Sequence, residues 1–111
     1  MIHIQHFVKD RAYGSHNGTI LADKVVPDTL NAPFEHAYGY LEDGNTMEGH
    51  SHPTDEIYIV CKGKGIVTVG TEQAEVSEGD VVAIPPNTYH TMTAQEHGCF
   101  LWATFWWPHI E

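Results

Sequence analysis

Positive charge is scarce in this chain of 111 residues. It carries 5 Lys plus Arg against 15 Asp plus Glu, which gives a formal net charge of -10 at pH 7. Such an acidic protein repels the phosphate backbone of nucleic acids and the headgroups of anionic lipids. We therefore expect no nucleic acid and no membrane surface among its partners.

Long hydrophobic runs are missing as well. No stretch approaches the roughly 18 apolar residues of a membrane-spanning helix. The N-terminal segment does not resemble a signal peptide, because Lys9 and Arg11 follow a short apolar run and no apolar core of sufficient length is present. These features together predict a cytoplasmic protein.

Cysteine is almost absent. Only Cys61 and Cys99 occur, both in apolar strand-like runs, and they lack the CxxC spacing of a metal site. Free cysteines are usually buried. We expect both to be buried free thiols.

Short runs rich in β-branched and aromatic residues alternate with turn residues through most of the sequence. The runs expected to form strands are 34–41, 56–61, 65–69, 81–84, 89–93 and 100–107. None carries a sustained 3.6-residue apolar stripe, so helix is expected at most as a turn or two near the N-terminus. Many short, evenly spaced strands predict an all-β sandwich or barrel. The division expected is an N-terminal extension over residues 1–30 and one barrel domain over 31–111.

Histidines at a spacing of two supply the first chemical signal. In an extended strand, His50 and His52 point to the same side. The turn 53–55 then lets Glu56 reach the same point in space, and an antiparallel barrel can bring His90 opposite the first two histidines. Three imidazoles and one carboxylate suit Mn, Fe, Co, Ni, Cu or Zn. Taken alone, the pattern leaves open a metal-free, hydrogen-bonded cluster.

The same residues resemble the two sequence motifs of the cupin family. The first motif is G, five residues, HxH, three or four residues, E, six residues, G, and it is matched by Gly44, His50, His52, Glu56 and Gly63. The second is G, five residues, PxG, two residues, H, three residues, N. Gly79, Pro85 and His90 match it, with Asn87 in place of the second Gly and Ala94 in place of the final Asn.

This resemblance implies an antiparallel jelly-roll barrel, the double-stranded β-helix of cupins, with the four ligands pointing into its mouth. It implies one divalent metal ion (Mn, Fe, Ni, Co or Zn) as cofactor and a homodimer in which residues 1–30 supply interface strands. Asn87 tolerates the left-handed turn conformation that the motif glycine adopts. Ala94 removes a polar side chain from the inner face and is expected to change substrate contacts rather than the fold.

Residues near the predicted ligands in the sequence are expected to take part in the same site. Tyr58 shares the inward parity of Glu56 and is the best candidate for proton transfer, although it can equally be a packing residue. Met92 and Ala94 share the parity of His90 and are expected to form an apolar wall. The row His36, Tyr38 and Tyr40 either lines the barrel, favouring a hydrogen-bonding substrate, or forms an outer stripe.

The last predicted strand is apolar on both faces, which indicates a strand covered on both sides. Packing in the core and against a partner explains this, and an aromatic wall formed over the metal by Trp102 or Trp106 is the alternative. The remaining histidines have no convergent spacing and are expected at the surface: His3, His6, His16, His97 and His109.

The function that follows is that of a metal-dependent enzyme acting on a small oxygen-rich metabolite, which would chelate the metal through two oxygens. Isomerases, dioxygenases, decarboxylases and lyases occur among the cupins that this chain resembles, and fold does not choose among them. The alternative is a non-catalytic module that binds or senses a small, sugar-type metabolite. Whether the protein is an enzyme stays open at this point.

Overall fold

Strands make up most of the computed structural model, which describes residues 2–108. A short 3-10 helix, η1 (Lys9–Arg11), comes first. The strands follow in this order: β1 (Tyr13–Ser15), β2 (Ile20–Asp23), β3 (Glu35–Glu42), β4 (Asp55–Lys62), β5 (Lys64–Val69), β6 (Glu72–Ser77), β7 (Val81–Ile84), β8 (His90–Ala94) and β9 (Cys99–Trp107). The all-β prediction is confirmed, and no helix among the described residues is long and apolar enough to cross a membrane.

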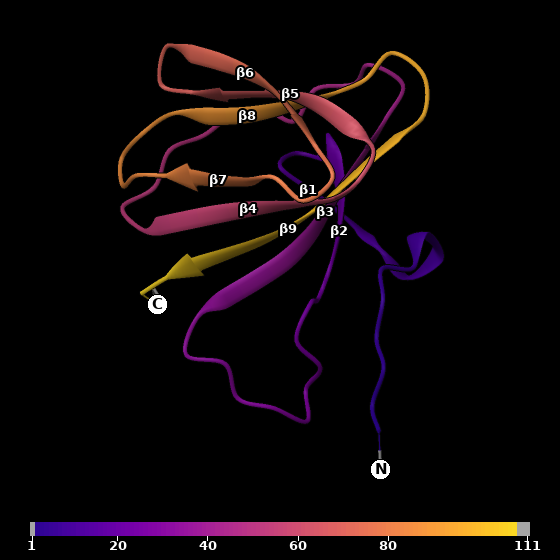
Figure 1. The fold of residues 1–111 in the computed structure, drawn as a ribbon. Helices are drawn as coiled ribbons and strands as arrows, with labels where there is room; N and C mark the ends of the chain where they lie inside the picture. The colour runs from indigo at the N-terminus through magenta and orange to yellow at the C-terminus, as the bar shows by residue number, and fades with distance from the viewer. Residues whose placement is uncertain (1, 109–111) are drawn as a thin grey trace.

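Two antiparallel sheets form the body of the molecule (Figure 1). The larger has the strand order β1-β2-β3-β9-β4-β7 and the smaller the order β6-β5-β8. The connection between β3 and β4 runs beside β8, where Thr46 pairs with Thr93 and His50 with His90. This connection links the sheets at the end of the molecule where the predicted ligands lie, as expected for a jelly roll.

The six predicted strand runs are all strands, but the sequence patterns missed β1, β2 and β6. Strand β6 lies at the edge of the smaller sheet, and every residue in it except Val76 is exposed. Because neither of its faces is apolar, β6 lacks the alternation on which the prediction depends. Strands β1 and β2 form a hairpin that extends the sheet beyond β3 of the same chain. The division at residue 30 stays a prediction.

The core lies between the two sheets and consists mainly of the side chains that the strands direct inward. Its buried members are Ile20, Leu41, Met47, Tyr58, Val60, Val67, Val76, Ile84, Met92, Ala94, Phe100 and Trp102. Trp102 is 1% exposed. Its indole occupies the space beside Gly39, where a Cβ atom would lie 2.3 Å from two of its ring carbons. A residue without a side chain is therefore needed at this position.

Register decides which way the aromatic row on β3 points. Trp102 pairs with Gly39 and Thr104 with Ala37, so these residues share the inward face. His36, Tyr38 and Tyr40 consequently face outward, and Phe7 stacks on Tyr40 with ring centroids 5.1 Å apart. Of the two alternatives for this row, the outer stripe is the one observed.

The two cysteines lie on the outer face of the larger sheet. Cys61 is exposed and Cys99 is half-buried, so the expectation that both are buried is wrong. The apolar residues around Cys61 belong to a strand whose outer face is itself apolar. At this residue the pairing of β4 with β9 shifts register between Val60 and Lys62. An apolar context in the sequence did not mean burial here.

Candidate metal centre

Four side chains from three parts of the chain converge at one end of the sheets. His50 and His52 come from the β3–β4 connection, Glu56 from β4 and His90 from the first position of β8. One ligand atom from each lies within 4.8 Å of the others. Paired backbone hydrogen bonds hold His50 beside His90, with N···O distances of 3.2 and 2.9 Å. The four residues that the sequence predicted as ligands therefore occupy one site.

Glu56 is the central group of this cluster and is 5% exposed. Its Oε1 atom lies 2.8 Å from Nε2 of His52 and 3.1 Å from Nε2 of His90. The hydroxyl of Thr104, on β9, donates to the other carboxylate oxygen. Burial alone would raise the pKa of Glu56, but its contacts with His90 and Thr104 outweigh burial and lower the pKa. The carboxyl group is thus ionised at neutral pH.

The rings of His52 and His90 are oriented by hydrogen bonds at their outer nitrogens. Nδ1 of His52 is 2.5 Å from the hydroxyl of Thr54, a residue that is 2% exposed. Nδ1 of His90 donates to the backbone carbonyl of Thr88 over 2.8 Å. Such contacts fix the tautomer and aim of metal-binding histidines. Both rings present Nε2 to the carboxylate.

Nε2 of His90 shows that these residues fit a metal ion. It is a buried nitrogen without a hydrogen-bond partner. The 3.1 Å separation from Glu56 is an ion-pair distance, which is favourable when the His90 ring carries a proton on both nitrogens. When the ring is neutral and donates from Nδ1, Nε2 has only a lone pair to offer the carboxylate. Two acceptors facing each other in a buried site are unfavourable, and a cation between them removes the conflict.

His50 completes the set as a neutral ligand. Burial, with a smaller contribution from the neighbouring His16, lowers the pKa of His50 from 6.5 to about 4. Metal ions bind the neutral imidazole. His50 is therefore ready to bind a metal at neutral pH without first losing a proton.

A fifth histidine lies against this cluster and was missed by sequence reasoning. His16 belongs to the turn between β1 and β2, and its Nε2 is 3.4 Å from Nε2 of His50. The two ring centroids are 4.3 Å apart. The expectation that His16 is a surface residue is wrong, because the hairpin folds over the cluster. His3, His6 and His97 are exposed as expected, and His109 lies outside the described residues.

The cluster borders a cavity of about 570 Å³. Tyr58, Trp102, Thr104 and Trp106 line it from the strand side, and Tyr13 and His16 from the β1–β2 hairpin. None of the described lining residues is a Lys or an Arg. A second hollow, of about 640 Å³, lies over β5, β6 and β8 and includes none of the four predicted ligands.

Tyr58 lies beside the cluster, as its strand parity predicted. It is 2% exposed, and its ring centroid is 6.0 Å from that of His90. Burial raises the pKa of Tyr58 well above its ordinary value. The phenol is therefore protonated at neutral pH and is suited to donating a hydrogen bond or a proton, not to acting as a base.

The two departures from the second cupin motif have different structural consequences. Asn87 has a φ of 59°, the left-handed conformation expected for it, and its N–H donates to the carbonyl of His52 over 2.7 Å. It thereby holds the segment that carries one predicted ligand. Ala94 is 5% exposed and forms part of the core together with Met92.

Comparisons with known proteins agree with this geometry. Residues 38–104, more than half of the chain, match the family model for the cupin domain. The chain is 31% identical over 84 residues to an uncharacterised protein of Methanocaldococcus jannaschii, covering 74% of this chain and 67% of that protein. It is 33% identical over 57 residues to an acireductone dioxygenase of Exiguobacterium sibiricum, covering 47% of this chain and 32% of that protein.

Among solved structures, a cupin 2 conserved barrel domain protein from Salinispora arenicola superposes with a TM-score of 0.83 at 25% identity. The superposition covers 96% of this chain and 89% of that one. Matched sequence, matched fold and a convergent His and Glu cluster lead to one conclusion. This chain belongs to the cupin family.

Proposed function

We propose that this cupin is an enzyme that uses one divalent transition metal to act on a small, oxygen-rich molecule. The observation that carries the proposal is the buried, unpartnered Nε2 of His90 facing the carboxylate of Glu56 beside an open cavity. His50, His52, Glu56 and His90 would hold the metal. The ion itself, which can be Mn, Fe, Co, Ni or Zn, would supply Lewis acidity or dioxygen activation.

The chain's own residues would orient the metal ligands, donate a proton and exclude water. Thr104 and Thr54 keep Glu56 and His52 aimed at the centre, so the ligand set does not have to reorganise when a metal enters. Tyr58, protonated and lining the same cavity, is the proposed proton donor to a bound substrate. The aromatic rings of Trp102 and Trp106 exclude water from one side of the cavity.

Cavity charge narrows the substrate class. Because the described lining has no Lys or Arg and the chain is strongly acidic, a phosphorylated molecule would find no cationic side chain. A small molecule with two adjacent oxygens can instead bind through the metal. The similarity to an acireductone dioxygenase supports this class. Dioxygenase, isomerase, decarboxylase and lyase chemistry are all compatible with the site.

A non-catalytic module that binds a small sugar-type metabolite is the second candidate. The observation in its favour is the scarcity of carboxylate and amine groups around the cavity. Apart from the predicted ligands, Glu35 is the one carboxylate among the described lining residues, and it stands at the start of β3, where it pairs with Trp106. A module of this kind would bind its ligand without converting it.

The metal is tested first. Protein purified without a chelator or a His tag is analysed for Mn, Fe, Co, Ni, Cu and Zn, and its melting temperature is measured with and without each ion. We expect close to one equivalent of a transition metal, and a melting temperature that rises when metal is returned to stripped protein. Less than about a tenth of an equivalent, with no change in melting temperature on adding metal, would exclude tight binding.

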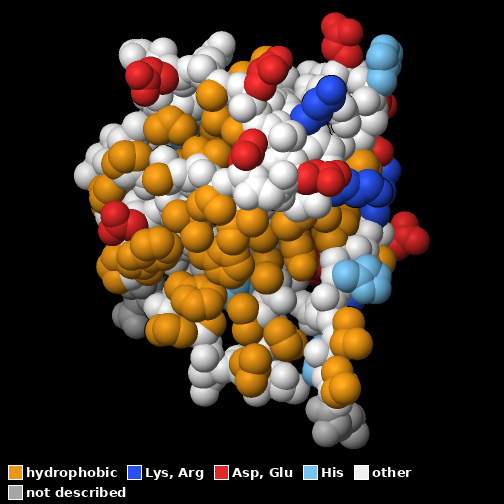
Figure 2. Space-filling view, viewed as in Figure 1, with side chains coloured by type: hydrophobic (Ala, Val, Ile, Leu, Met, Phe, Trp, Pro, Cys, Tyr) orange, Lys and Arg blue, Asp and Glu red, His pale blue; other side chains and the backbone are white. Residues whose placement is uncertain are grey.

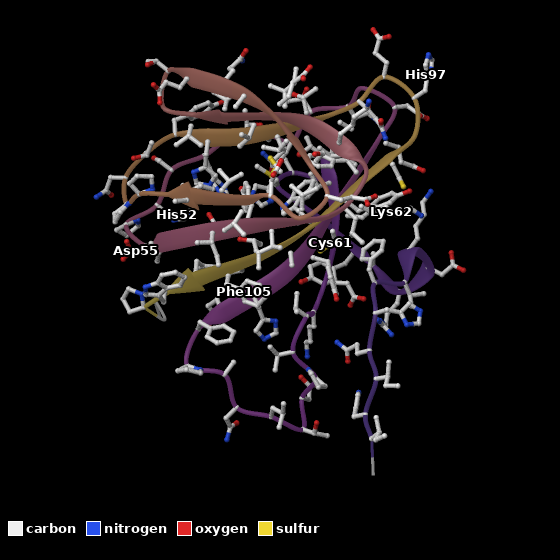
Figure 3. The ribbon with its side chains drawn as sticks, in the orientation of Figure 1. His52, Asp55, Cys61, Lys62, His97 and Phe105 are labelled. Carbon is white, nitrogen blue, oxygen red and sulfur yellow. The ribbon has the colours of Figure 1, made fainter. Side chains whose placement is uncertain are left out.

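Catalysis is tested next with a panel of small hydroxy acids, keto acids and sugars, incubated with loaded protein aerobically and anaerobically. Product formation that disappears in His50→Ala supports the enzyme. The matched control is His97→Ala, because His97 is exposed and lies far from His52, as Figure 3 shows. Saturable binding without any product supports the binding module instead.

We further propose that the protein is a homodimer that pairs through the outer face of its larger sheet. Figure 2 shows an apolar band across this face, over β9 and β4. Its members include Ile57, Ile59, Leu101, Phe105 and Val81, and Figure 3 marks Phe105 there. At the N-terminus, Ile2 and Ile4 are 84% and 83% exposed. Large apolar patches of this kind mark interfaces, and a second copy would cover both features.

Light scattering over a range of protein concentrations tests the dimer. We expect twice the chain mass for the wild type and a single chain mass for Ile59→Asp, which places a charge in the band. Ile66→Asp is the control, because Ile66 is 41% exposed on the smaller sheet. A compact monomer in the wild type would overturn this proposal. The predicted cytoplasmic location stays a prediction.

A further inference from the structure

The hairpin of β1 and β2 forms a wall of the metal centre. Its tip, residues 16–19, is fixed to the segment just before the first two predicted ligands. The side-chain amide of Asn17 donates to both carboxylate oxygens of Glu48, at 2.9 and 2.8 Å. The N–H of Glu48 in turn donates to the hydroxyl of Thr19 over 2.8 Å. Because Glu48 precedes His50 by two residues, these contacts fix the hairpin relative to the cluster.

Within this tip, the ring of His16 is aimed inward. Its Nδ1 is 3.1 Å from the hydroxyl of Ser15, which leaves Nε2 directed at the cluster, 3.4 Å from Nε2 of His50. The contact is favourable only if one of these two nitrogens carries a proton and the other offers a lone pair. In the tautomer in which the Ser15 hydroxyl donates to Nδ1, the proton of His16 is on Nε2.

His16 does not belong to the ligand set itself. The four predicted ligand atoms lie within 4.8 Å of one another, and no atom of His16 meets that condition with all of them. A metal bound through Nε2 of His50 would take the lone pair that His16 now faces. The N–H of His16 would then lose its acceptor while still lining the cavity, and an unpaired donor in a partly buried site is costly.

We propose that His16 contacts the small molecule held at the metal centre, through a hydrogen bond from its Nε2 to a ligand oxygen beside His50. The proposal rests on the metal-dependent function above and adds a ligand-contacting residue that comes from the N-terminal hairpin. Residues 13–20 therefore help to determine which molecules bind, although they lie outside the region that matches the cupin domain model.

Cobalt(II) and acetohydroxamate, a small ligand with two oxygens, provide the test. Wild type, His16→Asn and His16→Gln are stripped and reloaded, and their Co²⁺ affinity is measured by competition with a chelating dye. Acetohydroxamate is then titrated against each, with the visible absorption of Co²⁺ as the readout. Asn is chosen because it tolerates the φ of 52° at this position, and the longer Gln can restore a donor. His97→Asn is the control.

The expected result is a Co²⁺ affinity for His16→Asn close to that of wild type, with acetohydroxamate bound about tenfold more weakly, as for the loss of one hydrogen bond. His16→Gln should recover part of this loss. Two outcomes overturn the proposal: a Co²⁺ affinity at least tenfold lower in His16→Asn, which would make His16 a metal ligand, and unchanged affinities for both probes. Failure of the wild type to bind Co²⁺ would instead overturn the metal site itself, and with it the role of His16.

Discussion

Thr104→Val is the substitution that most directly tests whether the residues behind the ligands matter. Thr104 is 8% exposed, and its hydroxyl donates to the carboxylate oxygen of Glu56 that faces away from the histidines. Valine has nearly the same shape, so the change removes this donor without opening a cavity. It leaves a carboxylate oxygen in a buried site without its partner.

Removing this donor should lower both the stability of the stripped protein and its affinity for metal. Leaving a buried acceptor unsatisfied costs about 1 to 3 kcal/mol, so stripped Thr104→Val should lose about that much free energy of unfolding. Loss of the group that orients a metal-binding side chain typically lowers metal affinity by about 10- to 100-fold. The pKa of Glu56 should also rise, because the contact with Thr104 helps to lower it.

Urea unfolding of the stripped protein and competition with a chelating dye for Zn²⁺ measure the two effects. The matched control is Thr93→Val, which removes a hydroxyl that pairs with that of Thr46 over 2.9 Å outside the site. This control should leave Zn²⁺ affinity unchanged. If folded Thr104→Val bound Zn²⁺ within twofold of wild type, the view that Thr104 positions Glu56 for a metal would be refuted.

Three further predictions concern the fold around the site. Gly39→Ala should lower the free energy of unfolding by about 1 to 3 kcal/mol and alter tryptophan fluorescence, because the new Cβ would collide with Trp102. Gly14→Ala is the control and should fold normally, because its Cβ would meet nothing closer than 3.5 Å. Asn87→Gly should keep its melting temperature, while Asn87→Ala should lose about 1 kcal/mol because its φ is 59°. Acidification should destabilise the metal-free protein: the pKa of His50 falls from 6.5 to about 4 on folding, so the unfolded chain takes up a proton in that window that the folded chain does not. The contribution of His50 to stability is therefore full above pH 6.5 and is lost towards pH 4. After allowing for the partial exposure of the ring, the loss is about 1 to 2 kcal/mol of unfolding free energy. An unchanged urea midpoint between pH 7 and pH 4.5 would contradict this.

The sequence predicted those parts of the site that depend on local geometry. His50 and His52 share a side because they are two residues apart, and the short turn at 53–55 returns Glu56 to the same place. His90 is distant in the sequence, so only the second cupin motif connected it to the others. Its observed partnership with His50 depends on backbone pairing between a loop and β8, which no local pattern encodes.

The residues that surround the ligands could not be predicted in the same way. Thr104 was visible as the single polar side chain on the inward face of a strand otherwise lined by Phe and Trp, but its partner depends on the register of β9 against β4. His16 carried even less signal, because its position depends on a hairpin turn and on contacts with Glu48. The spacing of side chains in the sequence predicts which residues share a face within one element, whereas these contacts join separate elements.

The distribution of the predicted ligands between the two sheets has a consequence for stability. Glu56 belongs to the larger sheet and His90 to the smaller one, while His50 and His52 lie on the connection that bridges them. A metal bound here would therefore join the layers rather than rigidify a single loop, and the unfolded chain would have no comparable site. Binding energy then becomes folding energy, amounting to about 2.7 kcal/mol when free metal is at 100 times its dissociation constant. In the metal-free protein a neutral His90 ring turns a lone pair toward the Glu56 carboxylate, which weakens this same contact between the sheets. Metal removal should therefore loosen the packing of both sheets together.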